Sequence, residues 1–138
     1  MKSDLKFVNF VVPKFLFEKT AIQKEDNIFN IEPHAVIIRS EKQIHINIDV
    51  EILDPDHNFN LKMLSIGVFE YNTEDEAKLL NFISLNGPAI VFPYVRSFIS
   101  SYTALSGFDT ITLPTLNLSG YIEKIKDTLI DLDSLENE

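Results

Sequence analysis

A strict alternation of apolar and polar residues over residues 43–52 is the clearest pattern in the chain. Branched aliphatic residues take every second position, and polar residues stand between them. Since neighbouring side chains of a strand point to opposite faces of a sheet, the segment predicts a strand with one buried and one solvated face. The apolar positions are Ile44, Ile46, Ile48, Val50 and Ile52.

Three other segments also favour strands: residues 5–18, residues 34–39 after a mainly polar linker, and residues 59–71. The first contains Pro13, which cannot donate to a ladder and therefore predicts an edge position or a bulge. Both faces of this strand are apolar. We expect Leu5, Phe7 and Val11 on one face and Val8, Phe10 and Val12 on the other.

The hydrophobic period changes from two to about three and a half after residue 72, which predicts helices. Thr73 and Glu76 form a potential capping box for a helix expected to end at Gly87. A longer helix follows, with Pro93 predicting a kink and Gly107 suited to the left-handed cap. The first helix is expected to bury Ala77, Leu80 and Ile83, and the second presents the stripe Val91, Val95, Phe98, Tyr102 and Leu105.

Residues 108–118 form an apolar segment with a central proline, which favours an extended conformation. A last helix from about Ser119 places Ile122, Ile125, Leu129 and Leu132 on one face. Residues 131–138 then read as an acidic flexible tail of a single domain spanning residues 1–138. The order of elements predicts an α+β fold, a four-stranded antiparallel sheet covered on one face by a kinked long helix and a C-terminal helix.

The charge and composition exclude several classes of protein. The net charge is −9, from 21 acidic and 12 basic residues, and no basic patch is present, so nucleic-acid binding is not expected. There is no cysteine for a disulfide or a thiolate site. No apolar run approaches the ~18 residues that a membrane span requires, so we expect a soluble cytoplasmic chain without membrane insertion.

The side chains that carry chemistry are scattered. His34, His45 and His57 are not spaced as metal ligands, and Asp49 and Glu51 share the solvated face of a strand, where nothing in the sequence removes them from water. The sequence has neither a Gly-x-Ser-x-Gly elbow nor a glycine-rich phosphate loop. We therefore expect no enzymatic activity, no metal and no cofactor.

Apolar side chains exceed what one sheet face covered by helices should need. Eleven phenylalanines and four tyrosines occur in 138 residues. Two interpretations remain open at this point. These side chains complete the core and an oligomer contact, or some of them line a groove for extended, unfolded polypeptide.

Three motifs resemble the SecB protein-export chaperones: Phe92-Pro93-Tyr94-Val95-Arg96 after an Asn-Gly-Pro break, Gly107-Phe108, and Leu113-Pro114-Thr115-Leu116-Asn117-Leu118. The resemblance implies an ATP-independent holdase that binds unfolded preproteins in hydrophobic grooves and forms a homotetramer, a dimer of dimers. It implies an oligomer interface at Val91, Val95, Phe98 and Tyr102. It implies groove walls at Phe15, Phe17, Ile37, Leu116, Leu118, Tyr121, Ile122 and Ile125.

The resemblance also bears on the partner that receives the client. Members that serve export contact the motor SecA through acidic positions on the sheet; Glu18 matches one of them, whereas Lys14 and Lys62 stand at two others. SecA is therefore an implied partner with reversed charge at two contact positions. SecB-like chaperones that protect the antitoxin of a toxin-antitoxin pair, or act alone without SecA, are the alternative.

Overall fold

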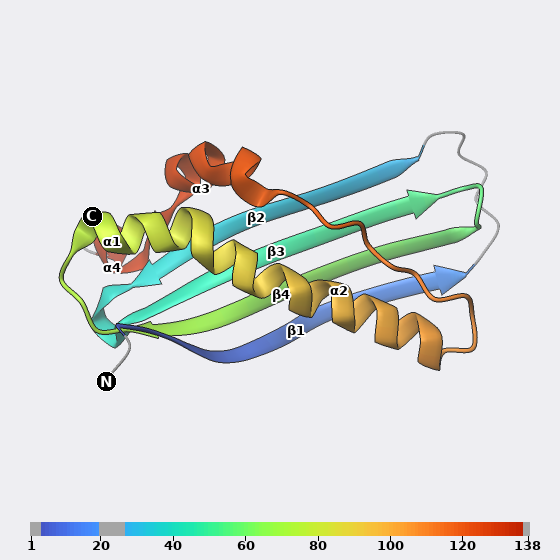
Figure 1. The fold of residues 1–138 in the computed structure, drawn as a ribbon, viewed down its shortest axis with the longest axis horizontal. Coiled ribbons are helices and arrows are strands. Elements are labelled where there is room, and N and C mark those ends of the chain that lie inside the picture. Colours follow the sequence, from blue (N-terminus) through green and yellow to red (C-terminus); the bar gives the residue numbers. More distant parts are fainter. Residues whose placement is uncertain (1–3, 20–26, 137–138) are drawn as a thin grey trace.

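A five-stranded sheet with helices on one face makes up the computed structural model, which describes residues 4–19 and 27–136 (Figure 1). The sheet order is β1-β4-β3-β2-β5. The first four strands pair antiparallel, whereas β5 pairs parallel with β2. The strands are β1 (Leu5–Lys19), β2 (Ile28–Ile38), β3 (Gln43–Asp54), β4 (Phe59–Tyr71) and β5 (Ile130–Asp131).

The α+β prediction is confirmed, with a short fifth strand added at the sheet edge. The long helix and the C-terminal helix lie over the same face of the sheet (Figure 1). The helical segments are η1 (Arg39–Glu41), α1 (Glu76–Asn81), the π-helical η2 (Phe82–Asn86), α2 (Gly87–Leu105), η3 (Leu118–Tyr121), α3 (Ile122–Thr128) and α4 (Leu132–Glu136).

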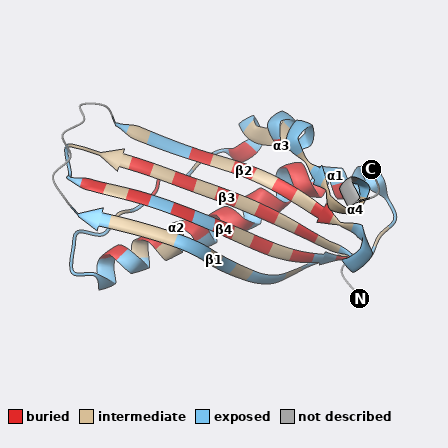
Figure 2. Cartoon of the chain, turned by 180° about the vertical axis from the view of Figure 1, so that it is seen from behind, coloured by how far each residue is buried: buried red, intermediate tan, exposed pale blue. Residues whose placement is uncertain are grey.

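The core lies between β3, β4 and α2. Ile44, Ile46 and Ile48 of β3 are 0% exposed, as are Val91 and Val95 of α2. Along β3 and β4 buried residues alternate with more exposed ones, as Figure 2 shows from behind. The alternation predicted for residues 43–52 is therefore confirmed.

The edge strand β1 differs from its predicted pattern. Its register against β4 shifts between Phe7 and Asn9 and again between Val11 and Lys14, so Pro13 lies in the second bulge. Each extra residue turns the following side chains to the other face. Phe10 and Val12 consequently pack on the core with Leu5 and Phe7, whereas Val8 and Val11 are exposed, which corrects the expected faces.

The first helix does not end at Gly87. Asn86 and Gly87 keep right-handed helical backbone angles, so the chain passes from α1 through the π turn directly into α2. The capping residue is Asp75, whose side chain accepts from the Lys78 N–H at 3.1 Å, rather than Thr73. Gly107, with φ of 87°, follows the end of α2 in the left-handed conformation, as predicted.

The buried helix faces also differ from those expected. In α1 and η2 the bulky side chains Leu79, Phe82 and Ile83 turn inward, whereas Ala77 and Leu80 stay exposed. In α2 the inward side continues through Ile99 and Thr103, and Leu105 is 88% exposed. Larger apolar side chains therefore take the places next to the sheet.

The C-terminal segment, predicted to be a flexible tail from residue 131, contains a short strand and a short helix in the described residues. Residues 131–136 belong to β5 and α4, and Val36 and Ile37 of β2 pair with Ile130 and Asp131. Residues 137–138 lie outside the described residues. Ile130 and Asp131 thus cover part of the β2 edge, which would otherwise be open.

Gly67 allows α2 to approach β4 closely, and an alanine there should destabilise the fold. A Cβ at Gly67 would lie 2.3 Å from Val91 Cγ2, and Val91 is fully buried and stiff. We expect Gly67→Ala to lower the free energy of unfolding by about 1–3 kcal/mol. Gly120→Ala is the control, because nothing lies within 4 Å of a Cβ there. Equal urea midpoints for the two variants at one protein concentration would contradict this packing.

Candidate functional site

Three polar residues of α2 fasten the extended segment 106–117, here called the crossover, to the helix. Arg96 Nε donates to the Leu113 carbonyl at 3.0 Å, and Ser100 Oγ donates to the Ile111 carbonyl at 3.1 Å. The Ile111 N–H donates to Thr103 Oγ1 at 2.9 Å. The spacing of four and then three residues places these side chains on one helix face. They satisfy backbone groups in a segment that belongs to no strand.

A cleft of about 270 Å³ opens between α2 and the end of the crossover. Aliphatic and aromatic side chains form most of its walls, and Arg96 is the one charged residue among those that line it. Such a surface can bind an apolar side chain without demanding a particular shape. The lining residues are Leu85, Ala89, Phe92, Pro93, Arg96, Thr115, Leu116, Asn117, Leu118 and Ser119.

A second apolar surface, here called the aromatic belt, lies where β1 meets α2. Phe15 contacts the rings of Tyr102 and Phe98, with centroids 4.5 and 5.0 Å apart. Tyr94 and Tyr102 remain 45% and 43% exposed. The belt therefore keeps aromatic surface open to a partner. Its members are Phe10, Phe15, Phe17, Tyr94, Phe98, Tyr102 and Phe108.

The residues expected to line one groove fall into three places. Phe15 and Phe17 join the belt, beside the expected interface residues Phe98 and Tyr102. Leu116 and Leu118 line the cleft, and Tyr121 and Ile122 are half-buried beyond it in η3 and α3. Ile37 and Ile125, like Val91 and Val95, are at most 1% exposed in the core of the single chain.

Sequence reasoning missed Leu85, Ala89 and Arg96 as cleft residues. Leu85 lies in the π turn, and the other two belong to the face of α2 beside the crossover. The spacing of Arg96, Ser100 and Thr103 is a detectable signal for a polar helix face. The sequence does not show which segment those side chains hold, because the crossover has no local pattern that pairs it with α2.

The outer face of the sheet is solvated and carries both signs of charge. Glu51 and Lys62 are opposite each other on β3 and β4, and His34 Nε2 lies 2.8 Å from Asp49 Oδ2. Lys14 and Lys62 line a shallow cavity of about 270 Å³ with Glu32, Asp49 and Glu51. Lys14 and Lys62, which stand where the resemblance implies acidic SecA contacts, thus lie beside carboxylates of the same sheet.

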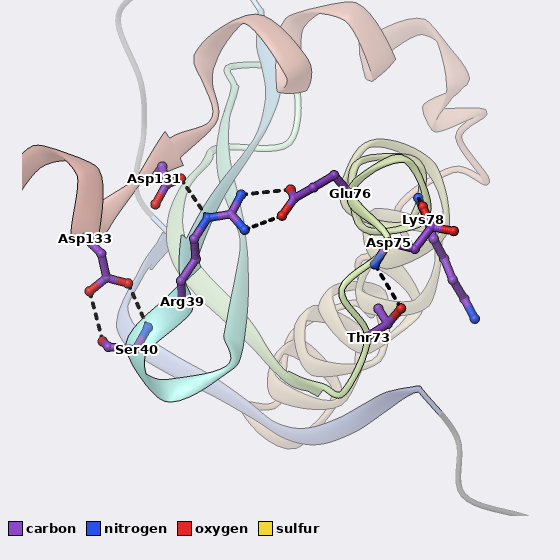
Figure 3. A network of polar contacts seen from close by, with 8 residues as sticks. All are labelled: Arg39, Ser40, Thr73, Asp75, Glu76, Lys78, Asp131 and Asp133. Carbon is purple, nitrogen blue, oxygen red and sulfur yellow. Dashed lines mark hydrogen bonds and ion pairs between the residues drawn. The ribbon is translucent and has the colours of Figure 1, made fainter.

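Arg39 joins three segments at one end of the sheet (Figure 3). Its guanidinium donates two hydrogen bonds to Glu76 of α1, at 2.6 and 3.0 Å, and one to Asp131 of β5, at 2.8 Å. The Ser40 N–H and hydroxyl donate to Asp133 at 2.8 and 2.9 Å. The bond from Arg39 lowers the pKa of Glu76, and the bonds from Ser40 lower the pKa of Asp133. We call these contacts the Arg39 clamp.

Two further classes of site have no support in the part of the chain that is described. No group of three or more His, Cys, Asp or Glu side chains in residues 4–19 and 27–136 is placed to hold a metal ion. Over the same residues, no helix has the length and apolar character needed to cross a membrane.

Comparison with known proteins identifies the family. The family model described as preprotein translocase subunit SecB matches residues 4–127. The chain belongs to the SecB family. Among SecB relatives, the protein-export protein SecB of Anaplasma phagocytophilum is 24% identical over 135 residues, covering 88% of this chain and 85% of that one. An uncharacterized protein of Methanocaldococcus jannaschii is 29% identical over 136 residues, covering 91% and 87%.

Solved structures share the SecB-like fold. A SecB-like chaperone of Mycobacterium tuberculosis, in complex with a peptide from an antitoxin, superposes with a TM-score of 0.63 at 15% identity, covering 83% of this chain and 88% of that one. A protein of unknown function from Streptococcus agalactiae gives a TM-score of 0.51 at 11% identity, covering 80% and 97%. The SecB family supports a chaperone role without enzymatic activity for this chain.

Acidification should release the C-terminal segment before the sheet unfolds. Glu76 and Asp133 have pKa values below the ordinary 4.5 and 3.8, so the folded clamp favours their charged forms. That stabilisation is complete above the ordinary values and is lost as the pH falls through the lowered ones. Amide exchange between pH 6 and 3, corrected for intrinsic rates, should show protection falling in β5 before β3.

Asp133→Asn provides the matched test of the clamp. The variant keeps the shape of the side chain but removes the charge, so β5 protection should already be reduced at pH 6. Simultaneous loss of protection in β5 and β3, with the same pH profile in the variant, would show that the clamp does not hold this segment.

Proposed function

We propose that the chain is an ATP-independent holdase that binds non-native polypeptides, most of all preproteins before export. The observation that supports this function is the apolar cleft beside an extended crossover. Family membership places the proposal among chaperones. The client would be an extended segment with apolar side chains.

Binding at such a surface would be broad because its strength comes from apolar area. A buried Leu or Phe side chain contributes about 1.5–3 kcal/mol, part of which offsets the ordering of the client. One cleft side chain therefore cannot retain a client by itself. Several contacts along the chain would give useful affinity with little dependence on sequence. We assign the cleft residues Leu116 and Leu118 to client contact, with Tyr121 and Ile122 extending the surface.

A second candidate function is protection of an antitoxin, or chaperone action without SecA. A structural relative of this chain binds an antitoxin peptide. Lys14 and Lys62 also place positive charge on the outer sheet face, where export members use acidic contacts with SecA. Like charges or missing carboxylates in a docking surface weaken association. Pull-down with SecA or with an antitoxin from the same genome would separate the two functions.

We propose that the aromatic belt forms the contact between copies in a homotetramer. Phe98 and Tyr102 point to β1 and keep exposed surface, whereas Val91 and Val95 are already covered within one chain. Of the four residues predicted for the oligomer interface, we propose Phe98 and Tyr102 as the ones that contact the other copy. Aromatic side chains of this kind are common anchors of protein interfaces.

Filling the cleft should abolish client protection. Ala89 is exposed and lines the cleft, so Ala89→Trp would occupy the space offered to a client side chain. The matched control is Ala104→Trp, an exposed alanine of α2 outside the cleft. Light scattering of a heat-unfolded model protein, without nucleotide, should show suppression by the wild type and the control and a loss of at least half of it in Ala89→Trp. No suppression by the wild type would refute the holdase proposal.

Breaking the belt should change the oligomeric mass. Tyr102→Glu places a charge among Phe15, Phe17 and Phe98, where burial in an interface would be unfavourable. Sedimentation velocity should show smaller species for this variant than for the wild type. Ala77→Glu, an exposed change on α1, serves as the control. An unchanged mass for Tyr102→Glu would remove the belt from the interface.

A further inference from the structure

The two arginines of the chain have contrasting surroundings. Arg39 is neutralised by two carboxylates, Glu76 and Asp131. Arg96 is half-buried, and its one hydrogen bond within the described residues runs from Nε to the Leu113 carbonyl. It forms no ion pair there, although the chain carries a net charge of −9. The guanidinium therefore retains N–H donors and a full charge for another partner.

Arg96 stands at the boundary of two hollows of opposite character. On one side is the apolar cleft with Phe92 and Leu116. On the other is an open hollow of about 350 Å³, whose lining is rich in hydroxyl groups and again contains no acidic residue. Its residues are Pro93, Arg96, Ser97, Ser100, Ser101 and Thr112.

We propose that Arg96 binds a side-chain carboxylate of the client, next to an apolar side chain seated in the cleft. This inference rests on the holdase function proposed above. A guanidinium offers parallel donors that match the two oxygens of a carboxylate, and the Ser97 and Ser101 hydroxyls add further donors. In an extended client, side chains two residues apart lie on the same side about 7 Å apart, which suits neighbouring hollows.

The site would give a chaperone of strongly negative charge a local preference for clients of the same sign. Long-range repulsion between exposed charges falls off over about 10 Å at moderate salt, whereas a partly buried pair is screened much less. Arg96 can therefore select an apolar-x-acidic segment despite the overall charge. The same residue acts as a positioning residue for the crossover, through its bond to Leu113.

Two peptides that differ only in one side chain, aspartate in one and asparagine in the other, test the proposal. Both are 12 residues long, acetylated and amidated, with a central Leu-Thr-Asp in one and Leu-Thr-Asn in the other, so the aspartate supplies the one carboxylate. Fluorescence anisotropy with the wild-type chain should show about tenfold tighter binding of the aspartate peptide, the size expected for a charge-assisted pair. The ratio should shrink between 50 and 500 mM KCl.

Variants assign the difference to Arg96. Arg96→Gln keeps a donor near Leu113 but removes the charge, so the aspartate and asparagine peptides should bind with equal affinity. Arg96→Lys should keep part of the preference. Lys6→Gln, at an exposed position on β1, makes the same change in net charge and should keep the full preference for the aspartate peptide.

The outcomes distinguish the carboxylate site at Arg96 from the holdase function on which it rests. If neither peptide binds the wild type, the polypeptide-binding function fails. If both bind equally, or if the preference survives in Arg96→Gln, the carboxylate site is wrong while the holdase stands. A smaller oligomeric mass of Arg96→Gln would assign the carboxylate partner to a second copy of the chain and overturn the proposal.

Discussion

One long helix and the short α3 have to cover an inner sheet face that is four long strands wide, and this constraint shapes the rest of the molecule. The close approach of Val91 to Gly67 places α2 over β3 and β4, where Val91, Val95 and Ile99 are fully buried. The short α3 lies over β2, whose inner residues Ile31, Ala35 and Ile37 are buried, so β1 is the long strand left with little helical cover. The inner face of β1 consequently meets only the side of α2, and its aromatic residues stay half exposed.

The crossover lies along the other side of α2, away from β1. It carries apolar residues toward α3 without joining a strand, because the polar face of α2 supplies its hydrogen-bond partners. A segment held by side chains rather than by a sheet ladder leaves space beside it, and the cleft is that space. The polar face of α2 and the apolar cleft are therefore two parts of one arrangement.

Local patterns sufficed to predict β3, the solvated outer face and the left-handed Gly107, because each depends on residues adjacent in sequence. They failed where distant segments decide the outcome. The β1 bulges depend on pairing with β4, and the π turn depends on how Phe82 and Ile83 reach the core. The expected groove set mixed core residues such as Ile125 with cleft residues such as Leu116, because both are simply apolar in the sequence.

The irregular edge of β1 has a consequence for a chaperone of the SecB family. A long, regular, apolar edge strand would invite extended clients to add as further strands and so seed fibrils on the chaperone itself. Two bulges and Pro13 interrupt the row of backbone donors that such templating requires. The β1 edge is therefore a poor template for the addition of a further strand.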